Sequence, residues 1–215
     1  MFDKRNFLTL VLFLLITISS SLGQAPLNSS ASPSSGSEEL KKFNKERLNI
    51  QVKGMAVLTA WSVGNIIYSS VGFANSDGGA NAQFHKMNIM WSGVNLLLSV
   101  PGLIGSARGK TDYDLKQSFK QQSGIEKTFI ANAALDLAYV AGGLYLVERG
   151  KNQTDQSKAD MFTGYGNAII FQGGFLMLFD GVMFAIQNSH GNKKLYKFLE
   201  NVSLSSNSVG FRHTF

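Results

Sequence analysis

Four apolar segments, each about 20 residues long, constrain the fold of this chain more than any other feature of its sequence. They are residues 54–73, 87–106, 128–147 and 168–187. At about 1.5 Å of rise per residue, a helix of this length crosses the roughly 30 Å hydrocarbon core of a bilayer. The sequence therefore predicts an all-α fold: a four-helix transmembrane bundle, with residues 54–188 as the membrane domain.

An outer-membrane β-barrel is the competing architecture. The end of the chain alternates in the manner of a final barrel strand, with Val209, Phe211 and Phe215 at odd positions. Barrel strands alternate apolar and polar residues along their whole length, whereas residues 168–171 and 175–179 are continuously apolar. This pattern favours helices.

Residues 1–23 have the pattern of a secretory signal peptide. Lys4 and Arg5 precede an apolar run at residues 7–18, and small residues follow as far as Gly23. This order is typical of export signals. An uncleaved anchor helix is the alternative, although the apolar run is short for a full span.

Three further segments differ from the spans in composition. Residues 24–37 are rich in serine and contain two prolines, so they are predicted to form a disordered tether. Residues 38–53 begin with two glutamates, which suit the positive end of a helix, and then carry several basic residues. They are predicted to form an amphipathic entry helix, and residues 189–215 a polar C-terminal tail.

Polar residues lie on one helix face of each span, which predicts a polar seam inside the bundle and apolar faces toward lipid. Two of them, Asp136 and Asp180, are acidic. A carboxylate at bilayer depth costs several kcal/mol unless it is paired or protonated, so such residues are candidates for function. The predicted intramembrane polar site consists of Asp136, Asp180, Gln172, Asn132, Asn65, Asn95 and Tyr139.

Counting residues along the spans predicts the depth of these side chains. Asp136 and Asp180 should lie level with one another, and Asn65 should lie level with Asn95. If the two carboxyl groups meet, they cannot both ionise easily in a low dielectric, so they would share a proton and form a proton or cation site. If they do not, the polar residues act as interhelical hydrogen bonds that hold the bundle together.

Small residues indicate where helices pack closely. Ala134, Ala138 and Gly142 form a ladder with a spacing of four residues in the third span, and Gly173 and Gly181 lie in the fourth. Such ladders allow the backbones of membrane helices to approach one another.

The composition argues against several classes of function. The chain has no cysteine, which excludes disulfides, thiolate metal sites and cysteine nucleophiles. Its net charge of +6 arises from basic residues that flank the spans, where lipid head groups are met, so nucleic-acid binding is not expected. His85 has no second ligand near it in the sequence, so neither a metal site nor a cofactor is expected.

The distribution of basic residues conflicts with the signal peptide. A cleaved signal would place residues 38–53 and 107–126 on the exported side, and these segments hold most of the lysines and arginines. The positive-inside rule predicts the reverse orientation. The sequence leaves both the orientation and the choice between inner and outer membrane open.

Three groups of residues resemble the motifs of a bacterial family of uncharacterised membrane proteins, a domain of unknown function with a signal peptide and four spans. The groups are Met87, Asn88, Trp91 and Asn95; then Asn132, Asp136, Tyr139, Gly142 and Gly143; and then Gln172, Gly173, Gly174, Leu176 and Asp180. The resemblance covers about residues 54–187. It implies a membrane architecture and carries no activity with it.

The predicted role is that of a non-enzymatic structural or interaction component of a membrane. The protein is predicted to reach this membrane through the secretory pathway. Its partner is then the lipid bilayer, with a second copy of the chain or another membrane protein as further candidates. The alternative is binding or transport of an ion, a proton or a small molecule through Asp136 and Asp180.

Overall fold

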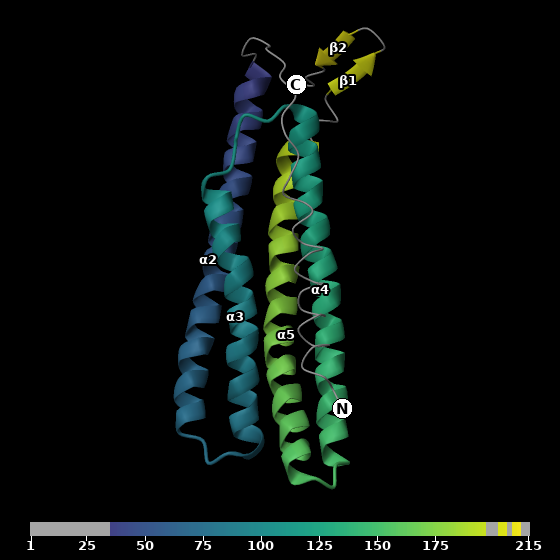
Figure 1. The fold of residues 1–215 in the computed structure, drawn as a ribbon. Coiled ribbons are helices and arrows are strands. Elements are labelled where there is room, and N and C mark those ends of the chain that lie inside the picture. The colour runs from purple at the N-terminus through teal and green to yellow at the C-terminus, as the bar shows by residue number, and fades with distance from the viewer. Residues whose placement is uncertain (1–34, 197–201, 206–207, 212–215) are drawn as a thin grey trace. The chain divides into compact units, whose positions relative to one another are not determined.

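The computed structural model describes residues 35–196 and the backbone of residues 202–205 and 208–211. The long helices of this part of the chain are α2 (Ser35–Ala74), α3 (Gly79–Ala107), α4 (Leu115–Lys151) and α5 (Gln156–His190) (Figure 1). A π-helical turn, η1 (Gly191–Tyr196), follows α5, and strands β1 (Val202–Ser205) and β2 (Ser208–Phe211) pair antiparallel. The predicted signal peptide and residues 24–34 of the predicted tether lie outside the described residues.

Each predicted span lies inside one of the four helices, and all four helices are long and apolar enough to cross a membrane. The all-α fold is therefore confirmed. The predicted entry helix, residues 38–53, is continuous with the first span, since both belong to α2. The predicted C-terminal tail contains η1 and the β1–β2 hairpin.

The helices form two antiparallel hairpins, α2 with α3 and α4 with α5 (Figure 1). The two hairpins pack against each other through α3 and α5. Helix α2 makes only a few contacts with α4 and α5. The turns within both hairpins lie at one end of the helices. The start of α2, the α3–α4 connection and the end of α5 lie at the other end, which we call the basic end after Lys41, Lys42, Lys45, Lys110 and Lys194.

Local sequence determines where the helices begin. Between α2 and α3, Gly78 and Gly79 have φ of 92° and 63°, values that glycine tolerates best. Asp114 starts α4 with a capping box, in which its carboxylate accepts a backbone N–H at 2.7 Å. Asp155 starts α5 similarly, and the hydrogen bond from the backbone N–H of Lys158 holds the pKa of Asp155 below its ordinary value.

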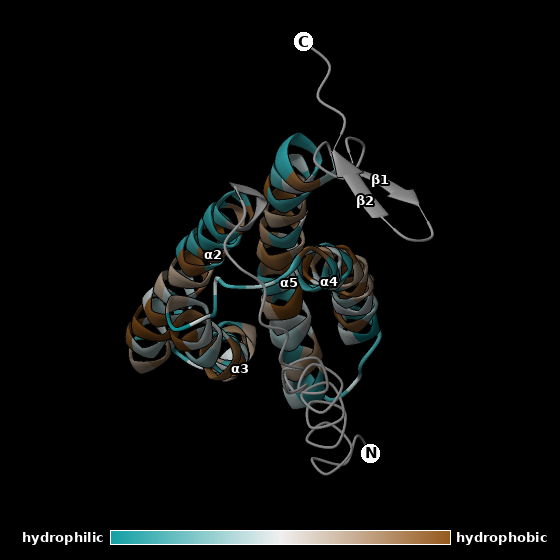
Figure 2. Cartoon of the chain, turned by 90° about the horizontal axis from the view of Figure 1, so that it is seen from above, coloured by the Kyte–Doolittle hydropathy of each residue, from teal (hydrophilic) through white to brown (hydrophobic). Residues whose placement is uncertain are grey.

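Apolar side chains point outward from the helices and polar side chains point inward. Leu97 and Leu178 each expose 67% of their surface, whereas Asn88 and Ser92 are fully buried. Figure 2 shows hydrophobic residues along the middle of the helices and hydrophilic residues at their ends. A soluble protein rarely exposes so much apolar surface, and helices surrounded by lipid are expected to do so.

The seam between α2 and α3 consists largely of small and polar residues. Its buried positions alternate at intervals of three and four residues, which keeps one stripe of each helix toward the other. They are Leu58, Ser62, Asn65 and Ser69 on α2 and His85, Asn88, Ser92, Asn95 and Ser99 on α3. Small side chains let the helices approach, and hydrogen bonds such as Thr59 Oγ1 to Ser99 Oγ, at 3.0 Å, join them.

The seam between α4 and α5 depends on glycine for close approach. A Cβ atom on Gly143 would lie 2.8 Å from the carbonyl oxygen of Gly166. A Cβ atom on Gly173 would lie 3.3 Å from the carbonyl oxygen of Asp136. The two backbones are therefore in direct contact at these positions.

The ladder of small residues predicted from the sequence is wrong as a packing face. Ala134, Ala138 and Gly142 are exposed, and a Cβ atom on Gly142 or Gly181 would meet no neighbour. The reason is helical geometry: residues two apart on a helix point to nearly opposite sides, so burial of Asp136 turns this ladder outward. Only Gly173 of the predicted set lies in the seam.

Candidate functional site

Gln172 of α5 is the centre of a buried hydrogen-bonded cluster that joins three helices. Its Oε1 accepts hydrogen bonds from Trp61 Nε1, at 3.0 Å, and from Asn95 Nδ2, at 3.3 Å. Its Nε2 donates to Ser92 Oγ, at 3.2 Å, and to Asn88 Oδ1. Both ends of this amide are therefore satisfied by side chains of α2 and α3, as buried polar groups require.

Asn88 extends this cluster toward the α2–α3 turn. Its Nδ2 donates to Asn65 Oδ1, at 3.0 Å, and to Ser69 Oγ, at 2.7 Å. Ser69 Oγ lies 3.3 Å from His85 Nδ1, and the His85 ring fills the space beside Gly72. His85 is thus a packed member of the seam, and no group of three or more metal-ligating side chains occurs among the residues that the structure describes.

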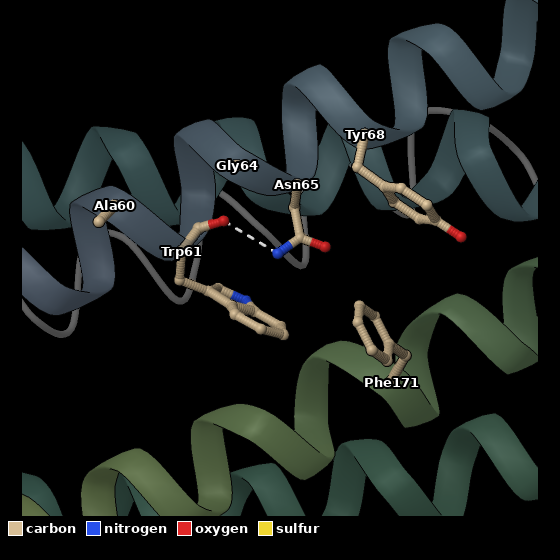
Figure 3. Close-up of a pocket in the computed structure, with 6 residues that line it drawn as sticks. All are labelled: Ala60, Trp61, Gly64, Asn65, Tyr68 and Phe171. Atoms are coloured by element: carbon tan, nitrogen blue, oxygen red, sulfur yellow. Dashed lines mark hydrogen bonds between the residues drawn. The ribbon is translucent and has the colours of Figure 1, made fainter.

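A shallow groove of about 370 Å³ borders this cluster between α2 and α5. Figure 3 shows Asn65 Nδ2 donating to the carbonyl oxygen of Trp61, while the ring of Phe171 reaches across from α5. The Trp61 ring stacks on Phe175 with ring centroids 3.7 Å apart. Tyr68 at the rim is 57% exposed, so the groove is open to the outer surface of the helices.

The carboxyl groups of Asp136 and Asp180 form a second buried site, between α4 and α5. Their carboxyl groups lie within hydrogen-bonding reach of one another, and the two residues are only 4% and 6% exposed. An ionised carboxylate only accepts hydrogen bonds, so a bond between two carboxyl groups requires a proton on one of them. The Oδ2 atom of Asp136 is buried, and no N–H or hydroxyl group in the described part of the chain donates a hydrogen bond to it.

Two other predicted site residues, Asn132 and Tyr139, flank Asp136 on α4. The ring of Tyr139 packs edge-on against Trp91 of α3, with ring centroids 4.9 Å apart. Asn132 lies about one turn before Asp136 and is half-buried, and no hydrogen bond joins it to another described residue. The seven predicted residues therefore divide between the Gln172 cluster, which includes Asn65 and Asn95, and the surroundings of the carboxyl pair.

The depth predicted from residue counting agrees with the structure for the aspartates and is wrong for the asparagines. Asp136 and Asp180 meet, whereas Asn65 receives its hydrogen bond from Asn88 and not from Asn95. The turn between α2 and α3 determines which residues face each other. Span boundaries taken from hydropathy miss that register by a few residues.

Sequence reasoning missed Trp61 as a site residue, and it also missed three small polar members of the Gln172 cluster: Asn88, Ser69 and Ser92. Serine is a common and inconspicuous residue in membrane helices, so hydropathy does not single it out. The signal that could have found these residues is the spacing of three and four residues between small polar side chains in both helices, which marks a helix–helix seam.

A third polar cluster lies at the basic end, at the edge of the predicted spans. Asn44 Nδ2 donates to Ser118 Oγ at 2.8 Å, and Gln122 Nε2 donates to the carbonyl oxygen of Gln187 at 2.7 Å. Arg47 is 1% exposed beneath the ring of Tyr113, with 5.8 Å between its Cζ and the ring centroid. These contacts join the entry segment of α2 to α4 and to the α3–α4 connection, and they join α4 to α5.

Comparison with known proteins identifies the chain only at the level of a family. Residues 57–181 match the family of unknown function DUF6992, and this match covers more than half of the chain. No curated protein and no solved structure matches the chain. The matched region contains the Gln172 cluster and both aspartates.

Proposed function

We propose that this chain, which belongs to the family of unknown function DUF6992, is a non-enzymatic multi-pass membrane protein that holds a proton on the Asp136–Asp180 pair. The observation that carries the proposal is the contact between the two buried carboxyl groups. Two negative charges in contact at low dielectric are strongly unfavourable, and one shared proton removes half of that charge and supplies the hydrogen bond.

A purely structural role fits the Gln172 cluster better than the carboxyl pair. The amide of Gln172 has its hydrogen bonds completed by neighbouring helices, as expected for a group that holds helices together. Oδ2 of Asp136 is buried and receives no hydrogen bond from an N–H or hydroxyl group of the described residues. Buried groups left incomplete in this way are costly, and they are retained at sites that exchange a proton or a ligand.

A proton suits the pair better than a metal ion does. Metal ions such as Ca²⁺ and Mg²⁺ are held by about six or more oxygen ligands arranged around them. Here the two carboxyl groups touch directly, and the flanking side chain of Tyr139 packs against Trp91. Asn132 and Tyr139 flank Asp136 on α4, and Gly173 of α5 packs against the backbone of Asp136.

The proposal predicts a protonated carboxyl group in the folded protein. Infrared spectra of the detergent-solubilised wild type at neutral pH should contain the carbonyl band of such a group, and the double variant Asp136→Asn with Asp180→Asn should lack it. Asp160→Asn, near the start of the same helix α5, is the matched control and should retain the band. A wild-type spectrum without the band would show that no proton is held.

The same experiment has a thermodynamic counterpart. Because the folded state holds a proton that the unfolded chain releases, the thermal stability of the wild type should fall as the pH is raised, whereas that of the double variant should not.

Proteoliposomes loaded with a pH-sensitive dye add the functional measurement. If the pair takes part in proton movement, wild-type vesicles will dissipate a pH gradient faster than vesicles containing the double variant at equal amounts of folded protein.

A further inference from the structure

A groove of about 600 Å³ lies at the basic end, between the first half of α2 and the chain that leaves α3. Lys41, Lys42 and Lys45 line it from α2. Ser106 and Thr111 line it from the end of α3 and the α3–α4 connection. This groove is separate from the Asp136–Asp180 pair and from the Gln172 cluster.

The groove changes from basic to apolar along α2. After the three lysines it is lined by Leu48 and Val52, and Val52 lies about 10 Å farther along the helix than Lys45. Gly109 brings the α3–α4 connection against this apolar part, because a Cβ atom there would lie 2.6 Å from Leu48 Cδ2. The apolar part adjoins Gly54, where the first predicted span begins.

Three lysines and one glutamate, Glu38, line the groove, so its positive charge is only partly compensated within the described part of the chain. Lys41 approaches Glu38 at 4.0 Å, and both side chains are exposed, so this ion pair is weak. Lys42 and Lys45 form no ion pair with a described residue. Of the two other glutamates in this stretch, Glu39 forms no ion pair with a described residue, and Glu46 is bound by Lys194 of η1 and also attracts Lys42. An anion from outside the chain would supply the missing charge.

We propose that this groove binds an anionic phospholipid. The phosphate lies among Lys41, Lys42 and Lys45, and the first part of an acyl chain lies along Leu48 and Val52. Charge complementarity supports the assignment, since basic clusters next to a transmembrane helix attract anionic head groups. Position supports it as well, since the groove lies where the charged part of α2 meets its apolar part, at the level of the head groups.

Native mass spectrometry of the full chain in a neutral detergent tests the proposal, with phosphatidylglycerol as the probe. The wild type should retain phosphatidylglycerol in preference to phosphatidylcholine. Each lysine near the phosphate contributes about fivefold in affinity, so Lys42→Gln with Lys45→Gln should weaken retention about 25-fold. Lys53→Gln is the matched control, because Lys53 is an exposed lysine of the same helix outside the groove, and it should leave retention unchanged.

Two further measurements separate the lipid from a soluble anion. Val52→Asn should weaken retention of phosphatidylglycerol, because it places a polar group against the acyl chain. Glycerol 3-phosphate in large excess should not displace the lipid. Displacement by glycerol 3-phosphate would overturn the proposal in favour of a soluble phosphate site. Equal retention of phosphatidylcholine, or an equal loss in Lys53→Gln, would show diffuse association without a groove.

Discussion

Gln172 and Asp136 are both buried polar residues in the middle of apolar helices, but their surroundings differ. The amide oxygen of Gln172 accepts hydrogen bonds and its amide nitrogen donates them. Its partners come from two other helices. Asp136 meets Asp180, and its buried Oδ2 receives no hydrogen bond from an N–H or hydroxyl group of the described residues. The first arrangement stabilises the fold, and the second leaves a group available for a proton.

Replacement of Gln172 tests the structural half of this contrast. Gln172→Leu removes the hydrogen bonds to Trp61, Asn88 and Asn95 and leaves those buried groups incomplete, so the free energy of unfolding should fall by about 2 kcal/mol. Gln156→Leu, which changes an exposed glutamine at the start of the same helix, is the control. Thermal unfolding in detergent measures both, and equal stability of the two variants would contradict the structural role.

At the level of the helices, the two hairpins use different devices to pack closely. α2 and α3 meet through small polar side chains that hydrogen-bond across the seam, as Ser69 does with Asn88. α4 and α5 meet through the glycine backbone, with Gly143 against Gly166. The hydrophobic driving force is absent between helices that lie in lipid, and in a membrane these two devices would replace it.

The glycine contact leads to a prediction with a control one residue away. Gly143→Ala places a methyl group 2.8 Å from the carbonyl oxygen of Gly166, so α4 and α5 must separate, and we expect a loss of about 1–3 kcal/mol in stability. Gly142→Ala points into open space and should leave stability unchanged or raise it by up to about 1 kcal/mol, because alanine favours helix. Chemical or thermal denaturation in detergent gives the comparison, and a harmless Gly143→Ala would show that the contact is not required.

At the level of the whole molecule, the hairpin arrangement places the start of α2, the α3–α4 connection and the end of α5 at one end. At the other end, residues 75–78 contain no basic residue, whereas Arg149, Lys151 and Lys158 flank the α4–α5 turn. One orientation in the membrane therefore applies to all four helices together. The positive-inside rule predicts the basic end on the cytoplasmic side, and a cleaved export signal predicts the reverse.

Labelling of single cysteines tests that orientation, and the chain has no cysteine of its own to interfere. We expect Asp77→Cys, in the α2–α3 turn, to react with a membrane-impermeant maleimide added outside intact cells. Asp112→Cys, in the α3–α4 connection, should react only after the membrane is opened. The opposite result would mean that an export signal at the start of the chain overrides the distribution of basic residues.

The sequence by itself determined the four helices and the types of polar residue at their centres, because length and hydropathy are local properties that the chain carries wherever it folds. It also indicated that Asp136 and Asp180 lie at one depth. Only the tertiary structure decided which polar groups meet. Gln172 has partners on α2 and α3 because α5 packs against the first hairpin mainly through α3. Asn65 bonds to Asn88 because the turn at Gly78 and Gly79 sets the register. Rotation and register of helices are relations between segments, and a pattern within one segment does not contain them.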